Sequence, residues 1–295
     1  MKQAAAGGGW RMLVAMVLSG TIGLFVIESG QSPQTVVFFR CLIGGLTLLA
    51  WLTLRREWRH LNTQAIGWLL LGGGALILNW LCLFSAYRLS SISVATVVYH
   101  TQPFFLILLA SLLQREIPAW HKLPWLVLAF AGVALTSGLD FDGNQTSLAS
   151  GALLALGAAF LYAVATLATR KLSDIAPAQV AGLQMLLGVL VLPPMTQFSM
   201  SEFHWNAWSS LLILGLVHTG LMYNLMYAAF QRLPSATIAS LSFVYPLVAI
   251  LVDLVFFHTK LNAGQIIGML LILLAVVANQ RDWKISTVGI FNLPN

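Results

Sequence analysis

The sequence predicts an all-α integral membrane protein with ten transmembrane helices, arranged as two inverted five-helix repeats. Three observations support this fold: the composition, a series of apolar segments of membrane-spanning length, and an internal repeat. Of the 295 residues, 59% are hydrophobic and only 8% are charged. A soluble globular domain usually has a charged fraction of about a quarter. The composition therefore excludes a water-soluble protein, and function must reside in the membrane bundle.

Ten apolar segments follow one another along the chain. At ~1.5 Å of rise per residue, roughly 20 residues of α-helix cross the hydrocarbon core of a bilayer. The segments lie near residues 10–28, 33–54, 64–87, 91–113, 120–138, 148–169, 177–198, 207–230, 235–257 and 264–281. Pro33 and Pro177 open the second and seventh segments. Proline is expected there because the first helical residue needs no N–H donor.

An internal repeat, offset by 144 positions, divides the chain into residues 1–143 and 144–295. The matching pairs are Pro33 and Pro177, Gly44 and Gly188, Leu81 and Leu225, Arg88 and Arg232, Leu89 and Leu233, Ser91 and Ser235, and Ala95 and Ala239. Each unit holds five predicted spans, an odd number, so the second unit enters the membrane from the opposite side. Inverted repeats of this kind build transporter folds that expose one site to alternate sides.

The basic residues predict the orientation. On one side lie twelve of them, namely Lys2, Arg11, Arg55, Arg56, Arg59, Arg115, Lys122, Arg170, Lys171, Arg232, Arg281 and Lys284. The other side has only Arg88 and Lys260, while Arg40 lies within a span. Cytoplasmic loops of membrane proteins carry the excess of Lys and Arg, so we expect both termini in the cytoplasm. Because these charges follow the loops and form no patch, no nucleic-acid partner is expected.

Two prolines fall near the middle of predicted spans. Pro103 in the fourth span and Pro246 in the ninth correspond after a one-residue slip in the repeat. Each should kink its helix at the membrane midplane and free the carbonyl four residues earlier, at Tyr99 and Ser242. Two outcomes stay open: a simple kink whose freed carbonyl binds a neighbouring Ser or Thr, or the wall of a wet cavity.

Three charged residues within or beside the spans need water, a partner or a role. Glu28 and Asp253 lie near the expected external helix ends and can reach water. Arg40 lies about two turns in from that side, and Glu28 is its nearest acidic candidate. Either the two form a structural pair or external gate, or Arg40 contacts the substrate directly.

The fourth span offers the best candidate binding face. Thr96, Tyr99, His100 and Pro103 follow the i, i+3, i+4, i+7 spacing that places residues on one side of a helix. Tyr223 and Tyr245 are expected to oppose this face. Buried phenols want hydrogen-bond partners, which favours a polar cavity with apolar walls for a small amphiphilic solute. His100 can titrate between pH 5 and 8 and so offers a route to proton coupling; a purely hydrogen-bonding role is the alternative.

Several local motifs resemble one transporter family. They are Val37-Phe38-Phe39-Arg40 in the second span, the run from Arg88 to Ala95 entering the fourth, and the later Pro103 and Glu116. Together with the five-plus-five duplication, they resemble the EamA type of the drug/metabolite transporter superfamily over nearly the whole chain. Two departures are Ser19-Gly20, where relatives commonly have Trp-Gly, and Thr259, at the repeat position of Glu116.

The resemblance implies a bacterial inner-membrane carrier that exports amino acids or other small metabolites through a central cavity. Carried onto this chain, it picks out Asn79, Tyr99, His100, Tyr162, Tyr223 and Tyr245 as lining residues. The function expected is therefore secondary transport by alternating access. The partners would be a small-molecule substrate and the lipid bilayer, with a coupling proton and a monomer or a homodimer left open.

Two other classes of function are weighed against transport. An intramembrane enzyme is disfavoured because the chain has neither H-E-x-x-H nor G-x-S-x-G. The sequence also lacks a nucleotide-binding G-x-x-x-x-G-K-[ST] loop and any spacing typical of metal ligands, so no cofactor and no metal are expected. A membrane sensor or partner-binding protein would normally need a soluble output segment, and no loop is long enough for one.

Overall fold

The computed structural model describes residues 2–89, 95, 98–115, 120–136, 145–196, 204–256 and 263–283. In this part of the chain every regular element is a helix, which confirms the predicted all-α class. The elements are α1 (Lys2–Ser29), α2 (Pro33–Arg55), α3 (Thr63–Leu89), α5 (Gln102–Gln114), η1 (Trp120–Lys122), α6 (Leu123–Thr136), α7 (Gln145–Lys171), α8 (Pro177–Val191), η2 (Pro193–Met195), α9 (Trp205–Gly215), η4 (Leu216–Leu221), α10 (Met222–Phe230), α11 (Ser235–Leu241), α12 (Val244–Phe256) and α13 (Ala263–Gln280).

Several of these helices have the length and apolar character that a membrane crossing needs. Within the described residues, six qualify: 7–29, 34–55, 63–83, 149–171, 205–230 and 235–256. Shorter apolar helices cover 102–114, 123–135, 177–191 and 263–279. Each of the ten predicted segments overlaps one of these helices. The chain is thus a multi-pass membrane protein, while a total of ten crossings stays a prediction.

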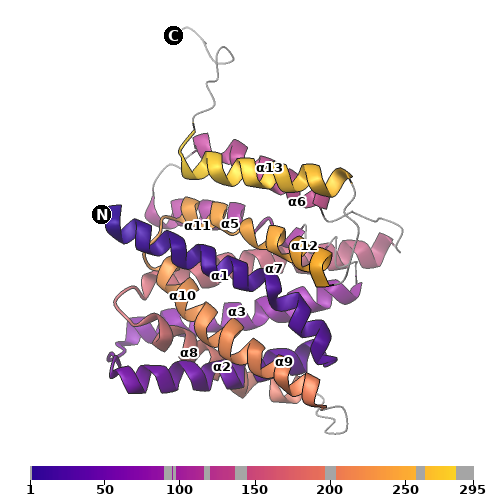
Figure 1. Ribbon diagram of the computed structural model, residues 1–295. Coiled ribbons are helices and arrows are strands. Elements are labelled where there is room, and N and C mark those ends of the chain that lie inside the picture. The colour runs from indigo at the N-terminus through magenta and orange to yellow at the C-terminus, as the bar shows by residue number, and fades with distance from the viewer. Residues whose placement is uncertain are drawn as a thin grey trace.

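Helix packing follows the repeat (Figure 1). Spans at equivalent positions in the two repeats pack against each other: the second against the seventh through α2 and α8, the fourth against the ninth through α5 and α11, and the fifth against the tenth through α6 and α13. The first helix of each repeat instead packs into the other repeat. Helix α1 lies against α9, α10 and α12, whereas α7 lies against α3 and α5. The pairings of α1 and α7 thus correspond when the repeats are exchanged, as a pseudo-two-fold relation between them would require.

The starts of α2 and α8 follow from local chemistry. Pro33 and Pro177 both lie in the first turn of their helices, as predicted. At α2, the Ser32 hydroxyl also accepts a hydrogen bond from the Thr35 amide at 3.3 Å. A serine at this position satisfies one of the backbone donors that the first turn leaves unpaired.

The fourth and ninth spans are each interrupted just before the proline that was predicted to kink them. Pro103 lies in the first turn of α5, directly after a turn at His100 and Thr101. Pro246 likewise lies in the first turn of α12, after a turn at residues 242–243. A proline donates no backbone hydrogen bond and clashes with the preceding turn, so a new helix begins there.

Hydroxyl groups support both breaks in the same way. Thr101 donates to the Val98 carbonyl and Ser242 donates to the Ala239 carbonyl, each over 2.7 Å. Neither of these hydroxyls binds the carbonyl that the proline was expected to free. The carbonyls that are bound lie one and three residues before Tyr99 and Ser242, the positions expected from the sequence.

The close approach of α2 and η4 depends on Gly44. A Cβ added at Gly44 of α2 would lie 2.5 Å from the Thr219 Cβ, so only glycine allows α2 and η4 to approach this closely.

At the other edge of the bundle, the Asp282 carboxylate lies 3.0 Å from His121 Nε2 and 3.3 Å from Lys122 Nζ. Hydrogen bonds from these two side chains hold the pKa of Asp282 below its usual value. This contact ties the start of α6 to the end of α13.

Candidate functional site

A buried asparagine connects three helices in the interior of the bundle. The Asn79 side chain of α3 is 0% exposed. Its Nδ2 donates to the Ala158 carbonyl of α7 at 2.7 Å and to the Tyr99 hydroxyl at 3.3 Å. Among the described residues, its Oδ1 has no hydrogen-bond partner. A buried acceptor without a donor is costly, so a ligand that donates to Asn79 would remove this penalty.

Aromatic rings extend the site in one direction from Tyr99. The Tyr99 ring lies 6.1 Å from that of Tyr162 and 6.5 Å from that of His100. His100 in turn stacks on Tyr245, with ring centroids 5.0 Å apart, and lies 6.1 Å from Phe243. His100 and Phe243 sit at the two helix breaks, so the broken spans of both repeats meet in this cluster.

Tyr223 of α10 extends the cluster in the other direction. Its ring packs edge-on against Trp80, the residue after Asn79, at 6.4 Å and lies 5.5 Å from Tyr227. Tyr162 reaches the same helix, because its hydroxyl donates to Met226 Sδ at 3.5 Å. The residues Asn79, Trp80, Tyr99, His100, Tyr162, Tyr223 and Tyr245 are called the aromatic cluster below.

The structure thus gathers most of the residues that the sequence picked out for binding. The exceptions are of two kinds. Thr96 lies outside the described residues, and so does the side chain of Asp253, whose backbone belongs to α12. Glu28 lies exposed near the end of α1, and among the described residues no ion pair joins it to Arg40. The pairing expected between these two side chains is therefore absent.

Arg40 lies beside the aromatic cluster. Its side chain is 6% exposed, and its guanidinium carbon lies 5.8 Å from the centre of the Trp80 ring. Its Nε donates to the Thr219 hydroxyl at 3.2 Å, and that hydroxyl donates to the Leu214 carbonyl at 2.9 Å. The sequence did not predict that Trp80 and Thr219 contact Arg40, since neither stands near Arg40 in the chain.

His218 precedes Thr219 in the chain, and the sequence predicted no role for it. It lies in η4, a π-helical segment, and is buried. Its Nε2 lies 2.8 Å from the Thr21 hydroxyl of α1, and its Nδ1 lies 3.3 Å from the Ile213 carbonyl. Single π-helical turns within α-helices are frequent at functional sites. The only signal in the sequence is that glycines at 215 and 220 flank the His-Thr pair.

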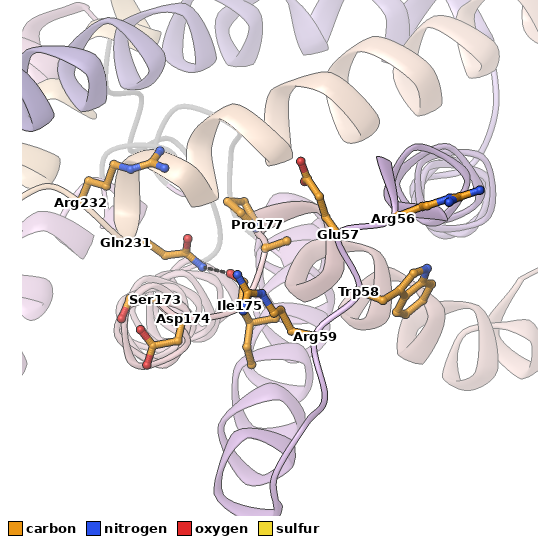
Figure 2. A pocket seen from close by; sticks show the side chains of 11 residues that line it. Arg56, Glu57, Trp58, Arg59, Ser173, Asp174, Ile175, Pro177, Gln231 and Arg232 are labelled. Atoms are coloured by element: carbon orange, nitrogen blue, oxygen red, sulfur yellow. Dashed lines mark hydrogen bonds between the residues drawn. The ribbon is translucent and has the colours of Figure 1, made fainter. Parts of the chain in front are cut away.

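A separate pocket opens at the end of the bundle that is predicted to face the cytoplasm (Figure 2). It has a volume of about 560 Å³ and is lined by Arg56, Glu57, Trp58, Arg59, Ser173, Asp174, Ile175, Ala176, Pro177, Gln231 and Arg232. Its walls are the α2–α3, α7–α8 and α10–α11 connections. The Gln231 amide donates to the carbonyls of Leu172 and Ile175, which fixes two of these connections together.

Comparison with known proteins identifies the family. The sequence model of the EamA-like transporter family matches the chain twice, over residues 7–138 and 149–279. The chain belongs to the EamA-like transporter family. The resemblance found in the sequence is thereby confirmed, and each EamA match falls within one of the two units expected from the repeat.

Individual relatives are also transporters. The chain is 30% identical to the "Uncharacterized transporter YxxF" of Bacillus subtilis, over 95% of this chain and 92% of the relative. It is 26% identical to the "Threonine/homoserine exporter RhtA" of Escherichia coli K12, over 86% and 85% of the two chains. A solved crystal structure shares the fold, with a TM-score of 0.78 and 20% sequence identity, over 93% of this chain and 96% of that chain.

Proposed function

We propose that this protein is a secondary transporter that exports a small metabolite such as an amino acid across the bacterial inner membrane. The observation that carries this proposal is the aromatic cluster, in which the buried Asn79 donates to Tyr99 while its Oδ1 has no partner among the described residues. Sites for small solutes are typically apolar, with a few polar groups that fix orientation. The relationship to a threonine/homoserine exporter supports an amino acid as the substrate.

Alternating access would follow from the way both repeats contribute to this cluster. Asn79, Tyr99 and His100 belong to the first repeat, whereas Tyr162, Tyr223 and Tyr245 belong to the second. A rocking motion of one repeat against the other would then open the same residues first to the cytoplasm and later to the outside. The helix breaks at residues 100–101 and 242–243 lie at the cluster and would absorb local changes of backbone angle.

The experiment is counterflow in proteoliposomes made with the purified full-length protein. Vesicles are loaded with unlabelled threonine or homoserine, and the entry of the same radiolabelled amino acid is followed without ATP. The expected result is transient accumulation of label that protein-free vesicles lack. The assay is repeated with each of the other proteinogenic amino acids. If neither homoserine nor a single proteinogenic amino acid is exchanged, the proposed substrate class is wrong.

A further inference from the structure

We propose that Arg40 binds the carboxylate of the transported solute, so the substrate class is small molecules with a free carboxylate and not lipophilic cations. This inference rests on the proposed transport function and names the chemistry of its substrate. It chooses between the two roles that the sequence left open for Arg40, because the alternative pairing with Glu28 is absent.

Among the described residues, no opposite charge accompanies the buried charge of Arg40. The side chain is 6% exposed, and no described carboxylate lies within ion-pair distance of it. A buried charge without a partner destabilises a protein, because the desolvation of the ion is not offset. A ligand that supplies the missing negative charge would explain why a guanidinium lies in this buried position.

The contacts of Arg40 hold its side chain and leave its binding edge free. The Nε atom donates to Thr219, and the ring of Trp80 flanks the guanidinium carbon. Among the described residues, no acceptor forms a hydrogen bond with the two Nη groups of Arg40. These groups are two of the donors that a carboxylate can bind in a bidentate manner, a geometry that lysine cannot reproduce.

The position of Arg40 beside the aromatic cluster sets the orientation of the solute. Trp80 lies next to both Arg40 and Tyr223, and Asn79 precedes Trp80 in the chain. An amino acid would direct its carboxylate to Arg40. Its ammonium group, which Arg40 repels, would then lie toward the unsatisfied Oδ1 of Asn79, an acceptor suited to a cationic donor.

The test combines ligand binding with variants of Arg40. The full-length protein is purified as wild type, Arg40→Gln, Arg40→Lys and, as a control, Arg55→Gln, which removes an exposed arginine from the same helix. Thermal unfolding is followed with threonine, with its amide and alcohol analogues, with the other proteinogenic amino acids and homoserine, and with lactate and acetate. The same compounds are compared as substrates in counterflow.

The wild-type and Arg55→Gln proteins should be stabilised by at least one carboxylate probe and not by its amide or alcohol analogue. Arg40→Gln should lose at least about tenfold in affinity for that probe, the effect of losing a hydrogen-bonded charge. Arg40→Lys should be intermediate. Without ligand, Arg40→Gln should unfold at the same or a higher temperature than wild type, because it removes an uncompensated charge.

The outcomes separate this proposal from the transport function. Counterflow of amide and alcohol analogues at the rate of the parent compounds would overturn the role of Arg40 and leave transport standing. Normal ligand binding by Arg40→Gln, together with a lower unfolding temperature, would also overturn the role of Arg40 in binding. That result would indicate that Arg40 stabilises the fold. Stabilisation by lactate or acetate that depends on Arg40, with no counterflow of any amino acid, would keep the carboxylate site and overturn amino acid export. If no carboxylate stabilises the wild type, the carboxylate site is wrong.

Discussion

Asn79 and Tyr99 form the contact in the candidate site that a single mutation tests most directly. The Tyr99 hydroxyl accepts a hydrogen bond from Asn79 Nδ2, which also donates to the Ala158 carbonyl. Removing that hydroxyl leaves Nδ2 with one of its two acceptors. Stability should therefore change little, while a solute that binds the same hydroxyl should bind more weakly without it.

Tyr99→Phe keeps the volume of the ring and is expected to weaken apparent substrate affinity by up to about tenfold, the value of one hydrogen bond of roughly 0.5–1.5 kcal/mol. The measurement is the concentration dependence of counterflow. Thr53→Val serves as the control, since it removes an exposed hydroxyl of α2 far from the cluster. An unchanged affinity in Tyr99→Phe would remove this hydroxyl from the site.

His100→Gln tests proton coupling. Glutamine keeps part of the hydrogen-bonding capacity of histidine but cannot take up a proton between pH 5 and 8. If His100 carries a coupled proton, transport driven by a pH gradient should fail in this variant while counterflow survives. Equal responses of wild type and variant to the gradient would assign His100 to stacking on Tyr245 alone.

At the scale of elements, the contact between α2 and the π-helical η4 is the one most sensitive to volume. Thr219 of η4 meets Gly44 of α2 and also holds Arg40. A change that separates these two helices should therefore disturb both stability and the candidate carboxylate site.

Gly44→Ala is expected to lower the thermal unfolding midpoint, because the new Cβ would overlap with Thr219 Cγ2. Overpacking of this kind typically costs about 1–3 kcal/mol. Gly67→Ala of α3 is the matched control, since a Cβ there meets nothing within 4 Å. That control should be neutral or stabilising by up to about 1 kcal/mol, through helix propensity alone. Equal midpoints for the two variants would mean that α2 and η4 do not pack this closely.

For the whole molecule, orientation in the membrane follows from the uneven distribution of basic residues. Reporters fused to each terminus should both report the cytoplasm, because twelve Lys and Arg residues lie on that side of the ten predicted spans and two on the other. A fusion on the α1–α2 connection, near Gly30, should report the outside and serves as the control. An external signal from either terminus would contradict the ten-span inverted arrangement.

Some features of the fold and of the candidate site were predictable from the sequence, and others were not. The helical class, the repeat and the helix starts at Pro33 and Pro177 were predictable, because apolar segment length and proline geometry act within a few residues. The proximity of Asn79, Tyr99 and His100 was also predicted, partly from helical spacing and partly from family resemblance. The breaks before Pro103 and Pro246 were not, because a proline in a helical sequence can produce either a bend or a new helix start.

Composition and repetition are properties of the chain alone, and they were enough to identify a duplicated, multi-pass membrane protein of the EamA-like transporter family. The surroundings of Arg40, in contrast, depend on the packing of the helices. The sequence offered Glu28 as its partner, but the structure supplies Trp80 and Thr219, 40 and 179 positions away. Contacts at such separations depend on how whole helices pack, and no local pattern in the sequence encodes them.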